Sequence, residues 1–250
     1  MPTHTDILDE MNRLIDAARA QEIFLRVIGG LAVRAHSGDY QKFFTREYPD
    51  IDFVTTDNDR RKLEPFFIEM GYESNKRFNL LNGDRRQIYH DDSTGRRIDI
   101  FVGDFHMCHK LPMNGRLHFD PVTVPLAELL LSKAQIVELN RKDAWDMASS
   151  LLYNETGNDD NNKINLSYIA QLCSNDWGLY KTTSINLKRV EEVVSEEKLN
   201  LTEAERGLIK KRVSDIYQAF EAMPKSIQWK MRDKVGTRVR WYDEVEEVAR

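Results

Sequence analysis

Residues 48–54, which read YPDIDFV, place two carboxylates inside an apolar stretch. Successive side chains of a strand point to opposite faces, so Asp50 and Asp52 share one face while Ile51 and Phe53 share the other. Like charges held this close repel each other, and their burial is costly unless a cation compensates them. The stretch therefore predicts a strand with one apolar face and one acidic face.

A third acid follows in the same kind of pattern. In residues 96–102 (RRIDIFV), Ile98 and Ile100 lie on one face and Asp99 lies on the other. If the two strands are neighbours, three carboxylates converge on one face of the sheet. Such a cluster is repulsive alone, but with magnesium its oxygens are hard ligands that can also hold the phosphates of a nucleotide. The alternative is an acid pair that is simply solvated on the open face of an edge strand.

A glycine pair precedes the acids by about twenty residues. Gly29 and Gly30 stand in residues 28–36 (IGGLAVRAH), where a predicted strand gives way to a predicted helix. Glycine lets the backbone approach a ligand closely, and a helix N-terminus offers unpaired N–H groups to a phosphate. A tight turn would explain the pair equally well on its own.

The order of predicted elements indicates an α+β fold with a mixed or antiparallel sheet flanked by helices. A helix over 5–21, with Thr5 as its N-cap, comes first. Strands over 23–28, 50–56 and 96–104 alternate with helices over 31–36 and 59–71. Between them, Asn82-Gly83 predicts a type I′ turn joining two strands of a hairpin.

The pattern changes after Pro125, where successive helical periodicities run to the C-terminal region. A polar loop over 154–162 separates two of them. These features predict two domains, an α+β domain over 1–124 and a helical domain over 125–250.

Composition excludes several classes of protein. The 250 residues are 41% hydrophobic and 31% charged with a net charge of −5, which is typical of a globular protein and not of a basic nucleic-acid binder. Residues 1–125 carry 17 Lys/Arg against 20 Asp/Glu (−3), and the remainder 19 against 21 (−2), so neither half is basic. Two cysteines, a polar N-terminus and no apolar run of membrane-spanning length predict a cytoplasmic protein that does not span a membrane.

Taken together, the glycine pair and the three acids resemble the nucleotidyltransferase superfamily that shares a catalytic core with DNA polymerase beta. The matching residues are Gly29, Gly30, Asp50, Asp52 and Asp99, within residues 25–105. The stretch from the glycines to the acid pair is especially similar to aminoglycoside and lincosamide nucleotidyltransferases and to AbiEii-type toxins.

The resemblance implies a reaction and a role for each of these residues. Asp50 and Asp52 would bind two magnesium ions that hold the triphosphate, and Asp99 would complete the second metal site and orient or deprotonate the attacking hydroxyl. Gly29 and Gly30 would cradle the phosphates. A nucleoside monophosphate would pass from an NTP to an acceptor, with release of pyrophosphate.

Lys133 lies inside an apolar helical stripe formed by Leu126, Leu129, Leu130, Ile136 and Val137. Its ammonium group either reaches water past its packed stem or is aimed at a triphosphate. Asp143 and Asp146 follow on one helix face, where favourable interaction with the helix dipole explains Asp143 better than Asp146. The segment resembles later motifs of AbiEii-type enzymes, which implies that Lys133 contacts the nucleotide and that Asp143 or Asp146 supports the site.

Three further features complete the candidates. Arg46 precedes the acid pair and is predicted to offset its charge or to contact phosphate. Residues 106–109 (HMCH) lack the ligand spacing of a zinc site. Near the C-terminus, Lys and Arg alternate with Trp229, Trp241 and Tyr242, which favours a packed terminal segment but is also compatible with nucleic-acid binding.

The sequence thus predicts a magnesium-dependent nucleotidyltransferase that uses an NTP. The toxin-like subclass is favoured, with RNA or protein as acceptor and an antitoxin protein as a restraining partner. The alternatives are a small-molecule, antibiotic-type nucleotidyltransferase and a nucleotide-binding module without turnover. The acceptor and the preferred NTP stay open.

Overall fold

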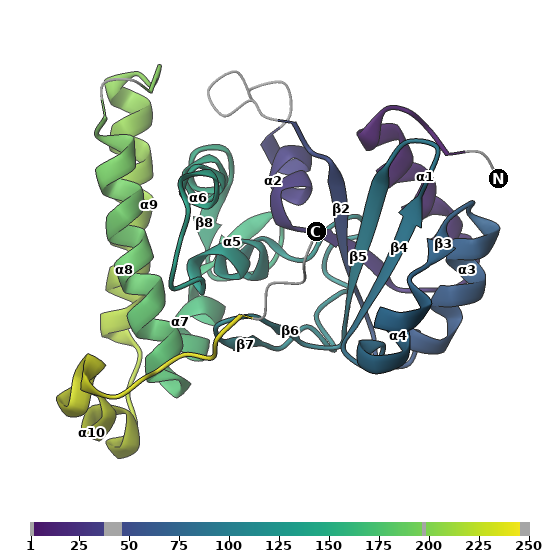
Figure 1. The fold of residues 1–250 in the computed structure, drawn as a ribbon. Helices are drawn as coiled ribbons and strands as arrows, with labels where there is room; N and C mark the ends of the chain where they lie inside the picture. Colours follow the sequence, from purple (N-terminus) through teal and green to yellow (C-terminus); the bar gives the residue numbers. More distant parts are fainter. Residues whose placement is uncertain (1–2, 38–46, 197–198, 246–250) are drawn as a thin grey trace. The chain divides into compact units, whose positions relative to one another are not determined.

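A computed structural model describes residues 3–37, 47–196 and 199–245 (Figure 1). The chain forms two compact units. The first comprises Met1–Ala32, Arg46–Phe105 and Pro112–Pro125, and the second comprises Val33–Thr45, His106–Leu111 and Leu126–Arg250, in so far as these segments are described.

The first unit is built on a five-stranded mixed sheet with the strand order β1-β2-β5-β4-β3. Strands β2 and β5 pair in parallel, whereas the neighbouring pairs β1–β2, β5–β4 and β4–β3 are antiparallel. The strands are β1 (Leu25–Ile28), β2 (Asp50–Thr55), β3 (Glu73–Ser74), β4 (Arg86–Asp91) and β5 (Arg96–Val102). The associated helices are α1 (Ile7–Ala20), the 3-10 helix η2 (Arg60–Lys62), α3 (Leu63–Glu69) and α4 (Lys76–Asn82), and α2 (Gly29–Ser37) begins in this unit.

One face of this sheet forms the core of the unit. Helices α1 and α3 lie on the same side of the sheet (Figure 1), and the ring of Phe67 in α3 stacks on Tyr89 of β4 with centroids 4.6 Å apart. Ile51 and Phe53, the apolar half of the strand predicted from alternation, are fully buried. Burial of each such side chain contributes about 1.5–3 kcal/mol, which fixes the apolar face inward and leaves the acids on the opposite face.

A cluster of hydrogen-bonded polar side chains links α1 to the residues that follow α3. Glu10 is fully buried, and Arg13 Nη2 and the Tyr72 hydroxyl donate to its Oε1 at 2.7 and 2.6 Å. Arg13 also donates to the carbonyl of Met70 at 3.0 Å. Burial by itself raises the pKa of Glu10, but the hydrogen bonds from Arg13, the His4 backbone and Tyr72 outweigh it and hold that pKa below its ordinary value.

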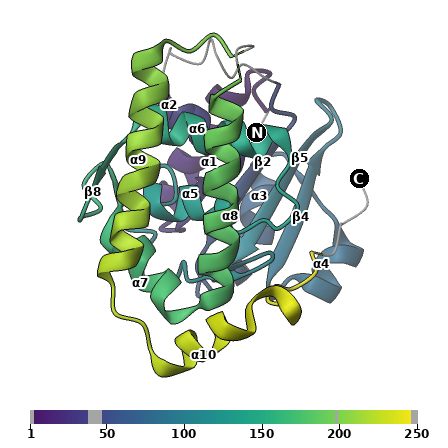
Figure 2. The ribbon, with the colours of Figure 1, turned by 90° about the vertical axis from the view of Figure 1, so that its left-hand side faces the viewer.

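The second unit is mainly helical. Its long helices α8 and α9 lie side by side (Figure 2) and contact each other. Leu187 and Val190 of α8 and Ile209 and Val213 of α9 are fully buried. The helices are α5 (Leu126–Ala134), α6 (Arg141–Tyr153), α7 (Leu166–Asn175), α8 (Trp177–Val194), α9 (Glu203–Ala222), α10 (Ile227–Val235) and the 3-10 helix η3 (Gly236–Arg238). Two short ribbons pair β6 (Phe105–His106), whose first residue belongs to the first unit, with β7 (Lys110–Leu111), and β8 (Glu155–Gly157) with β9 (Lys163–Asn165).

The predicted α+β class, with a mixed sheet flanked by helices and followed by further helices, is confirmed. The predicted hairpin around Asn82-Gly83 is wrong, because this segment is the end of α4. Asn75 caps that helix by accepting from the N–H of Phe78, and Gly83 has φ −66°, whereas a type I′ turn needs positive φ. The side chain of Asn79 bonds both the N–H and the carbonyl of Ile88, so the helix is held against β4.

Two helix boundaries also differ from the prediction. The N-cap of α1 is Asp6, not Thr5, because the Asp6 carboxylate accepts from the N–H groups of Leu8 and Asp9. Helix α5 ends at Ala134, before the last residues of the apolar stripe. There Asn186 Nδ2 donates to the carbonyls of Ala134 and Ile136, so a side chain from α8 takes the place of continued helical hydrogen bonding.

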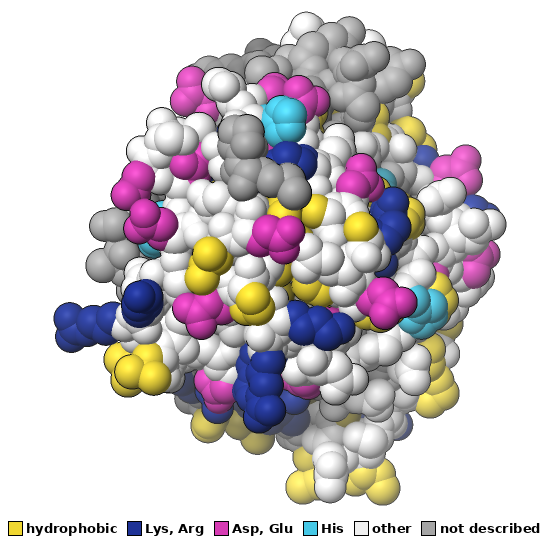
Figure 3. Space-filling view, turned by 90° about the vertical axis from the view of Figure 1, so that its right-hand side faces the viewer, with side chains coloured by type: hydrophobic (Ala, Val, Ile, Leu, Met, Phe, Trp, Pro, Cys, Tyr) yellow, Lys and Arg dark blue, Asp and Glu magenta, His cyan; other side chains and the backbone are white. Residues whose placement is uncertain are grey.

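The surface of the first unit carries both signs of charge. In the face seen in Figure 3, Lys and Arg side chains are interspersed with Asp and Glu, and hydrophobic side chains are scattered among them. In the described part of the chain, no helix has both the length and the apolar character needed to cross a membrane.

Candidate functional site

The strand register places the three predicted acids on one face of the sheet. In the parallel pair β2–β5, Asp52 stands opposite Asp99 and Asp50 stands opposite Arg97. Paired residues on adjacent strands project to the same face, and residues two apart along a strand do so as well. Asp50, Asp52 and Asp99 therefore share a face, which is the face opposite the core.

Three arginines occupy the same face. Arg97 lies two residues before Asp99 on β5, and Arg86 lies two residues before Ile88, which stands opposite Asp99 in the antiparallel β4–β5 pair. The third, Arg26, is turned away from the acids, because its Nε donates to the carbonyls of Leu117 and Asp120 at 2.9 and 2.5 Å.

Both oxygens of Asp99 are engaged by guanidinium groups. Arg86 grips the carboxylate with two hydrogen bonds, from Nε to Oδ1 at 2.6 Å and from Nη2 to Oδ2, and Arg97 Nη2 donates to Oδ2 at 3.0 Å. Asp99 is only 4% exposed, and the Arg86 guanidinium lies 5.0 Å from the ring centroid of Phe101. Burial alone lowers the pKa of Arg86, but the Asp99 carboxylate outweighs it and raises that pKa.

The other two acids have different surroundings. Asp50 and Asp52 are half-buried, and within the described residues no hydrogen bond or ion pair engages the Asp50 carboxylate. Asp52 lies against the strand-to-helix junction, since a Cβ atom added to Gly29 would come within 2.9 Å of Asp52 Oδ2. Gly29 also has φ +78°, a backbone conformation that disfavours other residues.

Gly29 and Gly30 are the first residues of α2, so the acidic face meets a helix N-terminus at this junction. The first N–H groups of a helix lack partners within it and favour negative charge. The glycine pair and the acid pair, separated in sequence, are therefore neighbours in space through Gly29 and Asp52.

The described geometry fits a metal at Asp50 and Asp52 better than at Asp99. Carboxylate oxygens are the ligands that magnesium prefers, and Asp50 and Asp52 carry them on one face of β2, where both side chains are half-buried. Asp99 instead has both oxygens committed to arginines. Among the residues that the structure describes, no group of three or more His, Cys, Asp or Glu side chains lies close enough together to hold a metal ion.

In the second unit the structure brings Lys133, Asp143 and Asp146 together. Lys133 Nζ lies 2.6 Å from Asp143 Oδ1 and 3.1 Å from Asp146 Oδ2. The ammonium group is thus turned toward two carboxylates, and both candidate acids contact it. Burial alone lowers the pKa of Lys133, but Asp146 and Asp143 outweigh it and raise that pKa above its ordinary value. Asn140 caps α6 and donates to Asp143 Oδ2 at 2.7 Å, which fixes the orientation of that carboxylate.

The remaining candidates have structural partners or lie outside the description. Arg46 falls outside the described residues. His109 Nε2 hydrogen-bonds Thr182 Oγ1 at 2.8 Å, and Cys108 Sγ accepts from the N–H of Val137 at 3.5 Å. These polar groups of residues 106–109 therefore serve internal contacts.

The aromatic residues near the C-terminus pack within the second unit. Trp229 Nε1 donates to the carbonyl of Cys173 at 2.9 Å, and Trp229 lies edge-on to Tyr180. Trp241 Nε1 donates to Thr182 Oγ1 at 3.0 Å. These contacts agree with a packed terminal segment.

Sequence reasoning missed the role of Arg86 and Arg97. The cluster of acids indicates that a cation must lie nearby, but not which one. Strand alternation alone places Arg97 on the acidic face. Arg86 is identified only by the β4–β5 register, which the sequence does not specify.

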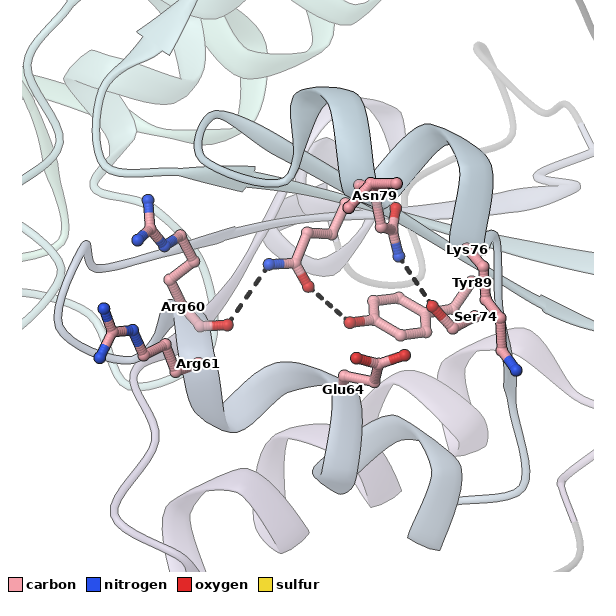
Figure 4. A pocket seen from close by; sticks show the side chains of 9 residues that line it. Arg60, Arg61, Glu64, Ser74, Lys76, Asn79 and Tyr89 are labelled. Atoms are coloured by element: carbon pink, nitrogen blue, oxygen red, sulfur yellow. Dashed lines mark hydrogen bonds between the residues drawn. The ribbon is translucent and has the colours of Figure 1, made fainter.

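A cavity of about 390 Å³ lies on the other face of the same sheet (Figure 4). Its floor is closed by internal hydrogen bonds, from the Tyr89 hydroxyl to Gln87 Oε1 at 2.5 Å and from Gln87 Nε2 to the carbonyl of Arg60 at 3.3 Å. None of the predicted site residues lines it; the lining residues are Arg60, Arg61, Glu64, Ser74, Lys76, Asn79, Leu80, Gln87 and Tyr89.

No protein-family model matches the chain, and no curated protein matches it either. Among solved structures, the chain is similar to a STING-associated CdnE c-di-GMP synthase from Capnocytophaga granulosa, at 10% identity and a TM-score of 0.31 over 85% of this chain and 79% of that one. A similarity this weak carries no argument about activity, so the function proposed below is based on the geometry of the site.

Proposed function

We propose that the chain is a magnesium-dependent nucleotidyltransferase that moves a nucleoside monophosphate from an NTP to an acceptor, with pyrophosphate as the leaving group. The observation that carries the proposal is the contact of Asp52, which shares a strand face with Asp50, with the glycine junction at the start of α2, where a Cβ built on Gly29 would lie 2.9 Å from Asp52 Oδ2. A metal-binding acid pair and a phosphate-binding turn are the two parts that the reaction needs side by side.

Asp50 and Asp52 would hold the metal ions that accompany the NTP. Bound magnesium would polarise the phosphoryl oxygens and stabilise the developing charge on the attacking and leaving oxygens. The chain supports this by presenting both carboxylates from one strand, whose apolar residues Ile51 and Phe53 are fully buried.

Gly29 and Gly30 would bind the phosphates. The absence of a side chain at Gly29 lets its backbone lie against the Asp52 carboxylate, and the helix N-terminus there attracts anions. A triphosphate bound here would have its negative charge next to both the metal ions and the helix dipole.

The acceptor class is proposed from the resemblance to AbiEii-type toxins. The pairing of Lys133 with Asp143 and Asp146 supports it, because the resemblance singled out these three residues. The acceptor would then be RNA or a protein, and an antitoxin would restrain the enzyme. A contact between Lys133 and the nucleotide stays a prediction.

Label transfer tests the proposed reaction. The full chain is incubated with cell extract, magnesium and NTPs labelled at either the α- or the γ-phosphorus. We expect a macromolecule to acquire the α-label and not the γ-label, and the transfer to disappear with a chelator or with Asp52→Asn. Asp92→Asn, a change at an exposed acid of the same unit, is the matched control and should transfer normally.

The outcomes separate the alternatives. Transfer of the α-label to a small molecule would favour the antibiotic-type enzyme. Tight NTP binding without any pyrophosphate release would favour a binding module without turnover. If Asp52→Asn transfers label as well as the unmodified chain, the assigned acid pair is wrong.

A further inference from the structure

The acidic face holds its three carboxylates in two different states. Asp50 and Asp52 are half-buried, and Asp52 lies against Gly29, whereas Asp99 is 4% exposed and receives three hydrogen bonds from Arg86 and Arg97. A three-acid metal cage requires the third carboxylate to be available, and here it is not.

The arginines are strong competitors for Asp99. A guanidinium group stays charged at any working pH and matches a carboxylate in a planar, two-bond fork. The Nε and Nη2 atoms of Arg86 form that fork with Asp99, and Phe101 lies against the guanidinium. A metal ion at Asp99 would have to displace the two Arg86 hydrogen bonds and bring more positive charge beside two half-buried guanidinium groups.

The charge of the face also favours leaving the arginines in place. Three carboxylates and two guanidinium groups nearly balance, so an added metal needs an incoming anion. The triphosphate of an NTP supplies that anion, and it then faces the two arginines as well as the metal.

One donor on this face has no hydrogen-bond partner among the residues that the structure describes. The Arg97 Nε atom is buried and has no acceptor there, although the Nη2 atom of the same side chain is bonded to Asp99. An unpaired buried N–H is costly, so this donor is suited to an acceptor oxygen that arrives with a ligand. A phosphate oxygen is the acceptor that the proposed substrate would bring.

We propose that Asp99 is a positioning residue, which holds Arg86 and Arg97 ready to bind the phosphate chain of the NTP, and that Asp50 and Asp52 alone supply the protein's metal ligands. This inference rests on the proposed function and revises the role that the family resemblance gives to Asp99.

Metal counting and nucleotide affinity test it together. The assay uses manganese in place of magnesium and an NTP whose methylene bridge between the α- and β-phosphorus blocks turnover. Electron paramagnetic resonance counts the bound manganese ions, and calorimetry measures the Kd of the nucleotide. For Asp99→Asn we expect the manganese count of the unmodified chain and a Kd raised about tenfold, because charge-assisted hydrogen bonds to phosphate are weakened. For Asp52→Asn we expect manganese to be lost.

Arg86→Gln covers the case in which Asp99→Asn fails to fold. If Asp99 only positions Arg86, this change raises the nucleotide Kd and leaves manganese affinity unchanged. If Asp99 is a metal ligand that Arg86 obstructs, manganese affinity rises instead, and the inference is overturned.

Two further results would count against the inference. Loss of manganese from Asp99→Asn, equal to that from Asp52→Asn, would make Asp99 a metal ligand and overturn the inference alone. If the unmodified chain binds neither manganese nor the nucleotide, the proposed function is overturned as well.

Discussion

Replacement of Lys133 by methionine removes one half-buried charge and keeps most of the side chain's length. In the second unit, Lys133 Nζ contacts Asp143 at 2.6 Å and Asp146 at 3.1 Å, and the three side chains are 16%, 17% and 7% exposed. Lys133→Met therefore leaves two closely spaced carboxylates without their cation.

The expected cost follows from this burial. Removal of one partner of a buried ion pair costs about 3–5 kcal/mol, and the residual exposure of Lys133 and Asp143 places the expected cost at the lower end, about 3 kcal/mol. Because the folded pKa of Lys133 is raised above 10.5, the stabilisation is complete below that pH and is lost as the pH rises through the folded value.

Tryptophan fluorescence in urea measures this cost selectively. All four tryptophans, Trp145, Trp177, Trp229 and Trp241, belong to the second unit. We expect Lys133→Met to lower the urea concentration at which half of the protein is unfolded, with little change in how steeply the free energy of unfolding depends on urea. We also expect it to lower the thermal midpoint by about 6–12 °C.

Matched variants distinguish an ion pair from a packing effect. Asp143→Asn in the Lys133→Met background should recover about 1 kcal/mol by removing one uncompensated carboxylate. Lys210→Met, on an exposed position of α9, should stay within about 0.5 kcal/mol of the unmodified chain. A loss below about 1 kcal/mol for Lys133→Met would refute the reasoning, because it would equate the cluster with a surface ion pair.

For three other substitutions we predict the direction of the effect. Glu10→Gln should cost about 3 kcal/mol of stability at pH 7. Burial raises the pKa of Glu10, but the hydrogen bond from Arg13 outweighs it and holds the folded pKa below 4.5, so the Glu10–Arg13 pair stabilises the fold above about pH 4.5 and this stabilisation is lost as the pH falls through the folded pKa. Urea unfolding followed by circular dichroism should therefore show the stability difference between the variant and the unmodified chain shrinking toward pH 3. Gly29→Ala should lower the thermal midpoint and weaken nucleotide binding, because its Cβ would lie 2.9 Å from Asp52 Oδ2 at φ +78°. Gly207→Ala, inside α9 with nothing within 4 Å of the added Cβ, should instead raise stability by about 0.5–1 kcal/mol, and equal shifts for the two glycines would contradict this account.

Alternation along single strands was enough to predict which residues share a face. Asp50 and Asp52 lie opposite the buried Ile51 and Phe53, as a period of two requires. The same rule placed Asp99 on the polar face of its own strand. Whether the two strands pair is a long-range property, and the parallel β2–β5 register that aligns Asp52 with Asp99 is visible only in the structure.

Local turn chemistry was misleading where tertiary contacts decide. Asn-Gly favours a hairpin turn, but Asn79 bonds the backbone of Ile88 on β4 and Asn75 caps the helix, so the segment forms α4. The same limit hid Arg86, whose contact with Asp99 depends on the β4–β5 register. Short-range patterns carry no information on such pairings.

Calorimetric titration with magnesium and an NTP whose α–β phosphorus bridge is methylene tests the central claim most directly. We expect the full chain to bind one nucleotide per molecule, and the binding to be lost with a chelator and in Asp52→Asn but retained in Asp92→Asn. Binding of equal affinity in Asp52→Asn, or no heat of binding to the unmodified chain, would contradict the assignment of the acidic face as the nucleotide site.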